Sequence, residues 1–407
     1  MKNNVFRGLK YLLLTYLLIT VVLPMGRLFG TIRGEDAAAV FSSAQFFPML
    51  KNSLATTLIA TAVSVVLSFA LAFLLNRSRI RFKSVFVVLF TLPMLIPSIS
   101  HGQGLVLLFG DNGLVTNLLG WNMGLYGYKG IVLGSVLYSF PVAFLMFQDS
   151  FQYEDFTVYE AAGVLGLSGW NQFCTITLPS MRRTIVSAVL AVFTMVFTDY
   201  GVPLMTGGTV MTLPVFMYRE VIGMMNFSGG AVVGVVLLLP AVAAFLMDLR
   251  NSNAPSSSTV TKPYAIPENK VRDVLVYLVF ALVLFALCLP IVAFVLLSFV
   301  KQYPIDLSFS LDTVRRLLSS GMGMYFVNSM AVALLTALIG TCLSYFSAFV
   351  TARSEKGITR QLLHFISMLS LAIPGIVLGL SFVLTFKSVP FYTTIFILLL
   401  VNIVHFF

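Results

Sequence analysis

Charged residues are scarce in this chain of 407 residues, because only 10% are Asp, Glu, Lys or Arg whereas 58% are hydrophobic. The mean hydropathy of +0.97 lies far outside the range of soluble globular domains. The net charge of +10 does not indicate a nucleic-acid partner, since most of the basic residues flank apolar runs. The composition therefore predicts an integral membrane protein that does not bind nucleic acid.

Residues that build catalytic or metal sites are also few. The three cysteines, Cys174, Cys288 and Cys342, are an odd number without close spacing, which predicts neither a disulfide framework nor a metal site. The three histidines are equally scattered, and no Ser/His/Asp arrangement stands out. The sequence contains no G-x-x-x-x-G-K-[ST] phosphate loop and no Gly-Lys dipeptide. We therefore expect no catalytic residue, no metal, no cofactor and no enzymatic activity of the chain's own.

Long apolar runs are what the chain has in abundance. About 20 apolar residues cross the ~30 Å core of a bilayer as a helix. Ten runs have this character: 9–29, 52–75, 84–109, 130–148, 183–203, 229–249, 274–299, 326–350, 362–386 and 391–407. No small-x-small cleavage motif follows the first run, so we expect a retained helix rather than a signal peptide. The predicted fold class is an all-α, polytopic helical bundle.

Basic residues are distributed unevenly between the segments that connect these runs. With the N-terminus in the cytoplasm, sixteen of the 25 lysines and arginines lie on the cytoplasmic side, and this bias predicts that orientation. The cytoplasmic clusters are Lys2/Arg7/Lys10, Arg77/Arg79/Arg81/Lys83, Arg182/Arg183, Arg250/Lys262/Lys270/Arg272 and Arg353/Lys356/Arg360. The loop 149–182 is then cytoplasmic, as is the Ser-, Pro- and Asn-rich segment 250–270, which is typical of a flexible linker.

An internal repeat flanks this linker. "NSLATTLIATAVSVVLSFALAFLLNRSR" from Asn52 aligns with "NSMAVALLTALIGTCLSYFSAFVTARSE" from Asn328, and further on Pro97, Gly102 and Phe109 align with Pro374, Gly379 and Phe386. The pattern predicts a first membrane domain at 1–249, the linker at 250–270, and a second domain at 271–407. Both copies would insert the same way up, with a substrate pathway between them. Alternatively, the duplication only stabilises the bundle.

The second copy is shorter than the first. "FYTTIFILLLVNIVHFF" at 391–407 corresponds to "YGYKGIVLGSVLYSF" at 126–140, after which the first copy continues into its loop. The second domain is therefore predicted to be truncated before its own loop, and we expect a second E-A-A-x-x-x-G motif downstream of Phe407. An inactive half that only associates with other subunits is the alternative.

The loop contains an unusual stretch, "YEAAGVLGLSGWNQFCTITLPS" at 159–180. Gly166 is suited to end a short helix, and Pro179 is suited to the first turn of a new one. Because Ala161 and Ala162 are small, the first helix could lie deep in a partner's groove. The alternative is an amphipathic elbow at the membrane surface that has no partner.

This stretch resembles the EAA signature of binding-protein-dependent ABC importer permeases. The matching residues are Glu160, Ala161, Ala162, Gly166, Ile176, Leu178 and Pro179. The resemblance implies two tandem copies of a type I permease domain in a bacterial inner membrane. It also implies that the loop couples the chain to a dimer of ABC ATPase subunits, and that a periplasmic binding protein delivers the cargo.

A second stretch, "VFTDYGVPLMTGG" followed by "YREVIGMMNFSGGAVVGVVLLLPAVAAFLMD", is similar to the fused permeases of the 2-aminoethylphosphonate group, relatives of the ferric iron and thiamine permeases. The resemblance implies 2-aminoethylphosphonate as substrate, with ferric iron, thiamine or polyamine as alternatives. A secondary transporter or channel is the alternative from another class, although such proteins do not need an EAA loop.

Polar side chains in or next to apolar runs suggest contact with the substrate, because burying them in a membrane is costly. His101 and Gln103 lie in the third run, where the second copy has Leu378 and Leu380. Asp199 and Tyr200 lie near the outer end of the fifth run, before a glycine-rich turn. We select these four as substrate-pathway candidates; packing between helices and capping of the outer loop are the alternatives.

Overall fold

A computed structural model describes residues 2–252, 262, 264–354 and 357–407. The described residues are mainly helical, and they divide into two compact units. One unit contains Phe47–Val215 and Ala244–Phe309, and the other contains Met1–Phe46, Phe216–Ala243 and Ser310–Phe407. The predicted linker 250–270 lies outside the described residues at 253–261 and 263, so its flexibility stays a prediction there.

The first unit is built around long helices. Its elements are α4 (Phe46–Asn76), α5 (Lys83–Thr91), η2 (Leu92–Leu95), α6 (Ser98–Phe109), α7 (Leu114–Leu119), α8 (Tyr128–Gln152), α9 (Thr157–Val164), α10 (Gly169–Gln172), η3 (Phe173–Thr177), α11 (Leu178–Phe197), α12 (Gly201–Thr206), α13 (Leu213–Tyr218), α15 (Lys270–Leu297), β1 (Val300–Gln302) and β2 (Asp306–Phe309).

The second unit gathers helices from both ends of the chain. Its elements are α1 (Lys2–Leu17), η1 (Leu18–Val22), α2 (Leu23–Gly30), α3 (Gly34–Ser42), η4 (Arg219–Gly223), most of α14 (Phe227–Ser252), α16 (Asp312–Ser319), α17 (Met322–Arg353), α18 (Ile358–Ala372), α19 (Gly375–Phe386), η5 (Pro390–Thr393) and α20 (Ile395–His405).

Helix length and composition confirm an all-α polytopic membrane protein. Six helices of the described residues are long and apolar enough to cross a membrane, and a seventh candidate is a pair, Lys83–Leu95 and Ser98–Leu119, bent by 94°. Some of the ten predicted apolar runs are interrupted among the described residues. The run 84–109 breaks at Ile96, which is extended (φ −104°, ψ 134°) because the proline that follows disfavours helical backbone. The same chemistry breaks the run 362–386 at Ile373, before Pro374.

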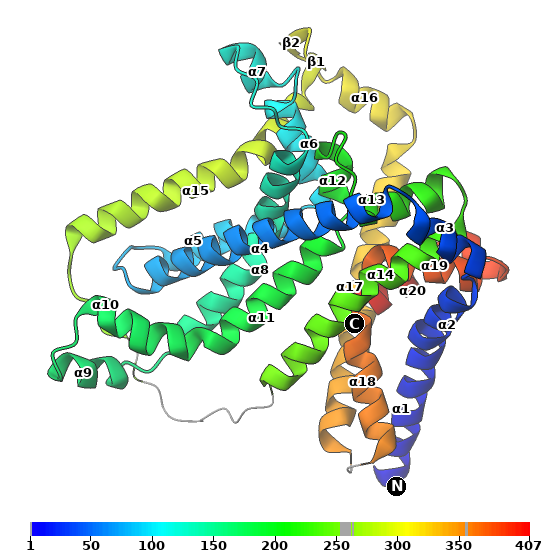
Figure 1. Ribbon diagram of the computed structural model, residues 1–407, viewed down its shortest axis with the longest axis horizontal. Coiled ribbons are helices and arrows are strands. Elements are labelled where there is room, and N and C mark those ends of the chain that lie inside the picture. The colour runs from blue at the N-terminus through cyan, green and yellow to red at the C-terminus, as the bar shows by residue number, and fades with distance from the viewer. Residues whose placement is uncertain (1, 253–261, 263, 355–356) are drawn as a thin grey trace. The chain divides into compact units, whose positions relative to one another are not determined.

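In the first unit, α8 packs against α11, α5 and α6 (Figure 1). Four phenylalanines that are fully buried fill the core of this bundle: Phe90, Phe140, Phe144 and Phe147. Hydroxyl groups join α4 to α8, since the Ser64 and Ser139 oxygens lie 3.0 Å apart and Ser68 donates to the Phe140 carbonyl at 2.7 Å. Such interhelical hydrogen bonds are a common means of fixing helices in an apolar medium.

Helix α15 also belongs to this unit, although it begins the predicted second domain. It packs on α6, and Gly104 makes the close approach possible, because a Cβ atom there would lie 2.5 Å from the Pro290 carbonyl oxygen. Beyond α15, β1 and β2 form a small antiparallel hairpin that the sequence did not predict. Tyr303 anchors the hairpin, with its hydroxyl 2.9 Å from the Leu107 carbonyl oxygen.

In the second unit, α1 lies alongside α17 and α18, and α2 packs on α19 (Figure 1). The rings of Phe6 and Phe349 are 5.7 Å apart, and the Ser347 and Ser367 hydroxyls join α17 to α18 at 3.1 Å. Each compact unit thus includes the first helix of the other predicted copy. The boundaries 1–249 and 271–407 stay a prediction drawn from the repeat.

Candidate functional site

The predicted coupling loop folds into two short helices between α8 and α11. Asp155 begins it by accepting hydrogen bonds from the Thr157 backbone N–H at 3.1 Å and the Thr157 hydroxyl at 2.8 Å. These bonds favour the charged carboxylate and lower the pKa of Asp155. Helix α9 ends at Val164, and Gly166 follows with φ +74°, which glycine adopts without strain. The prediction that Gly166 ends this helix is confirmed. Pro179 does not start a new helix as predicted, because it follows the π-helical turn η3 within a helix that is continuous from Gly169 to Phe197.

The two faces of α9 differ sharply. Tyr159 and Ala162 are buried, whereas Ala161 is exposed and Glu160 is half-exposed. At the tip of the loop, Val164, Leu165 and Trp170 are 89%, 78% and 72% exposed. We call these three residues the apolar tip. Ile176, the next residue of the EAA pattern, is half-buried in η3.

A polar cluster supports the buried face of α9. Arg77, at the end of α4, pairs with Glu154 at 2.6 Å, and the two side chains are only 11% and 7% exposed. The Tyr159 hydroxyl donates to the Glu154 carboxylate and lies 2.8 Å from the Thr177 hydroxyl. Burial, followed by the bond to Glu154, raises the pKa of Tyr159. Sequence reasoning missed this cluster, although an arginine just after an apolar run and a glutamate just before a loop were visible.

The described part of the linker lies against the same helix. The Phe156 N–H donates to the Lys262 carbonyl at 3.0 Å, and the Lys262 ammonium pairs with Glu160 at 2.5 Å. The Tyr264 ring contacts the rings of Phe156 and Tyr159 at centroid distances of 4.7 and 5.2 Å. Glu160 therefore has a partner within its own chain, which the EAA pattern alone did not reveal.

The four substrate-pathway candidates do not form one group. His101 is fully buried, with Nε2 2.9 Å from the Pro93 carbonyl oxygen, whereas Gln103 on the same helix is exposed. Asp199 accepts hydrogen bonds from the Ser98 hydroxyl at 2.6 Å and from the Val202 N–H at 3.0 Å. These contacts correspond to the alternative of capping. Tyr200 is half-buried next to it.

Two cavities can be compared with the space that a substrate pathway needs. One, bordered by Asp199, has a volume of about 10 Å³, enough for one water molecule and no solute. The other is an open groove of about 1160 Å³ in the second unit, between α17, α19 and α20. Asn328 and Ser329 line it, whereas the corresponding Asn52 and Ser53 of the first copy bond to the backbone of Met211 and Leu213 at 3.1 and 2.8 Å. Among the described residues no cluster of His, Cys, Asp or Glu could hold a metal ion.

Comparison with known proteins identifies the first part of the chain. Residues 64–251, which include the coupling loop, match the family described as "Binding-protein-dependent transport system inner membrane component". The chain is 26% identical over 388 residues to the ferric transport system permease protein FbpB of Actinobacillus pleuropneumoniae, covering 89% of this chain and 55% of the relative.

Two further relatives agree with that match. A putative ferric transport system permease protein FbpB 1 of Haemophilus influenzae is 24% identical, with 89% of this chain and 60% of the relative covered. The thiamine transport system permease protein ThiP of Escherichia coli is 23% identical, with 87% and 66% covered. The chain thus spans little more than half the length of the ferric permease relatives. The predicted resemblance is confirmed: residues 64–251 match the inner membrane components of binding-protein-dependent transport systems.

Proposed function

We propose that this chain is a permease subunit of an ATP-driven importer, placed in a bacterial inner membrane with its N-terminus in the cytoplasm. It forms the translocation pathway for a small polar solute that a periplasmic binding protein delivers. The chain itself is not an enzyme, and ATP is hydrolysed by a dimer of partner ABC ATPase subunits. The observation that supports this proposal most strongly is the apolar tip of the coupling loop.

The apolar tip has the chemistry of a protein-docking surface. Three large apolar side chains project from a loop whose other face is fixed by buried polar contacts. Fully burying a side chain of this kind contributes about 1.5–3 kcal/mol, so contact with a partner's groove would favour binding. A tryptophan such as Trp170 is also among the residues that most often dominate the energy of an interface. In this arrangement ATP-driven movement of the partner would push on α9 and move α8 and α11, which flank the loop.

Co-purification with the cognate ATPase tests this proposal. Leu165→Asp places a charge in the apolar tip, and we expect it to weaken binding at least about tenfold, the equivalent of ~1.4 kcal/mol. Leu118→Asp is the matched control, because Leu118 is a similarly exposed leucine (72%) in the short helix α7, outside the loop. Glu160→Lys should also weaken binding. Equal retention of ATPase by the Leu165 and Leu118 variants would contradict the proposal.

For the substrate, we propose 2-aminoethylphosphonate, because the stretches 196–208 and 218–248 are similar to permeases of that group. The names of the relatives favour ferric iron or thiamine as the alternatives, and polyamine is a further one. Calorimetric titration of the cognate periplasmic binding protein with these four ligands distinguishes them. Uptake into proteoliposomes that follows an ion gradient and ignores ATP would instead indicate a secondary transporter.

A further inference from the structure

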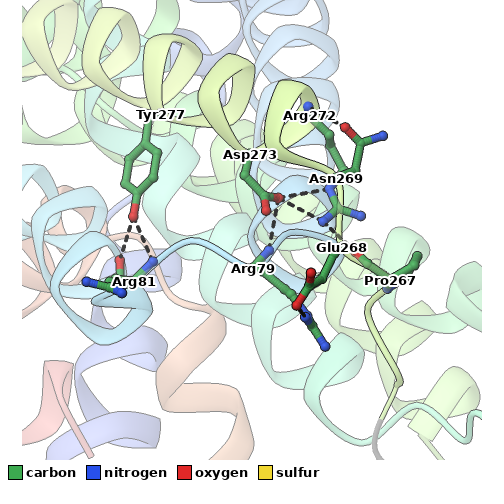
Figure 2. Close-up of polar contacts among 8 residues, drawn as sticks. All are labelled: Arg79, Arg81, Pro267, Glu268, Asn269, Arg272, Asp273 and Tyr277. Carbon is green, nitrogen blue, oxygen red and sulfur yellow. Dashed lines mark hydrogen bonds and ion pairs between the residues drawn. The ribbon is translucent and has the colours of Figure 1, made fainter.

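The loop between α4 and α5, residues 77–82, is held by the segment that leads into α15 (Figure 2). The Arg79 guanidinium pairs with Glu268 at 2.5 Å, and the Arg79 N–H donates to the Asp273 carboxylate at 3.1 Å. Two residues further on, the Arg81 N–H donates to the Tyr277 hydroxyl at 2.7 Å. Three contacts spread over ten residues of the segment thus fix the start of α15 against this loop.

The start of α15 is itself ordered by internal contacts. The Asn269 side chain caps the helix by accepting from the Arg272 N–H at 3.0 Å. The Arg272 guanidinium donates to Asp273 at 2.8 Å and to the Pro267 carbonyl at 2.9 Å (Figure 2). Asp273 therefore accepts hydrogen bonds both from Arg272 and from Arg79 of the α4–α5 loop. If the loop and the start of α15 separated, the Asp273 carboxylate would lose its bond to the Arg79 N–H.

Arg77 connects this arrangement to the coupling loop. Its guanidinium carbon lies 3.3 Å from the centroid of the Tyr264 ring and 4.8 Å from that of Tyr159, while its nitrogen pairs with Glu154. A partly buried arginine that contacts two aromatic rings gains cation–π attraction as well as charge pairing. One side chain from the start of the α4–α5 loop thus contacts Glu154 just after α8, the buried face of α9 and the linker.

We propose that Lys262 and residues 264–277 form a clasp that makes the coupling loop, the α4–α5 loop and the start of α15 move as one body, with Arg77 as its central positioning residue. The clasp rests on the proposed coupling function and extends it. Movement of α9 passes to α15 through Tyr264, which is six residues from the first residue of that helix. The linker between the two predicted domains is then a transmitting element and not only a tether.

A disulfide between the coupling loop and the linker tests joint movement. Because the Phe156 N–H donates to the Lys262 carbonyl at 3.0 Å, Phe156→Cys with Lys262→Cys introduces two thiols on backbone segments that are in contact, and non-reducing electrophoresis checks that they cross-link. The native Cys174, Cys288 and Cys342 are first replaced by serine. In the full chain, assembled with its ATPase in proteoliposomes, we expect ATP-driven uptake to be the same with the disulfide oxidised or reduced. Loss of uptake on oxidation, restored by reduction, would show that the segments separate and would overturn the proposal.

Substitution of Arg77 tests the positioning role. We expect Arg77→Gln to leave ATPase binding intact but to lower the solute imported per ATP hydrolysed by about fivefold or more, which is the range of coupling between protein sites. Arg81→Gln is the matched control, because it removes the same charge from the same loop while Arg81 contacts Tyr277 through its backbone only. Equal import per ATP in the two variants would overturn the proposal.

Two variants of Tyr264 test the contact between Arg77 and the linker without changing the charge of the chain. Tyr264→Phe retains the ring against Arg77 and should preserve coupling, whereas Tyr264→Ala should lower import per ATP as Arg77→Gln does. If Tyr264→Ala couples normally, the linker contact transmits nothing. Failure of the underlying function is distinguishable, because then the unmodified chain would neither bind an ATPase nor show ATP-driven uptake.

Discussion

Replacing Gly104 by alanine should separate α15 from α6. The added Cβ would lie 2.5 Å from the Pro290 carbonyl oxygen and 3.0 Å from the Pro290 carbonyl carbon. Carbon–oxygen contacts normally begin near 3.3 Å, so the helices must part by about 0.8 Å. Overpacking of this kind costs about 1–3 kcal/mol, and the higher helix propensity of alanine offsets about 1 kcal/mol of it. We expect the free energy of unfolding to fall by up to about 2 kcal/mol.

The corresponding helix of the second copy supplies the control. A Cβ atom added at Gly379 in α19 would meet no atom of the described residues within 4 Å, so Gly379→Ala should be neutral or stabilise the chain by up to about 1 kcal/mol. Titration with sodium dodecyl sulfate in mixed micelles measures both free energies. Equal stability of the two variants would refute the packing of α15 on α6, and with it the grouping of α15 with the first copy's helices.

Two further substitutions test local structure. Asp199→Ala should lower the free energy of unfolding by about 3 kcal/mol, because the Ser98 hydroxyl and two backbone N–H groups lose their acceptor. Asp199→Asn, which keeps an acceptor oxygen, should cost about 1 kcal/mol in the same titration. Gly166→Ala should destabilise the coupling loop by about 1 kcal/mol, because alanine is strained at the φ of +74° that Gly166 adopts. Gly163→Ala is the control and should not destabilise the loop, because a Cβ atom there would meet no atom within 4 Å. Faster amide exchange of α9 in both variants would contradict this explanation.

Local features of the coupling loop could be predicted from the sequence because single residues determine them. A glycine after a short helix supplies the left-handed backbone that ends α9. The same kind of reasoning, applied to prolines, would have placed the breaks at Ile96 and Ile373, because the residue before a proline avoids helical backbone. The list of apolar runs did not show these breaks because the runs were chosen by apolar length alone.

Contacts between distant segments could not be predicted in this way. The partners of Glu160 and Arg77, Lys262 and Tyr264, are 102 and 187 positions away along the chain, and nothing in their immediate sequence selects one cation or ring over another. The sequence repeat also indicates that the two copies share a fold. It does not indicate against which copy the first helix of each, α1 or α15, packs. That choice depends on close approaches such as the one between Gly104 and Pro290. Gly104 faces the backbone of Pro290, whereas Gly379 in the second copy faces open space. Both positions are glycine in the sequence, so only the packing shows that glycine is required at the first and merely tolerated at the second.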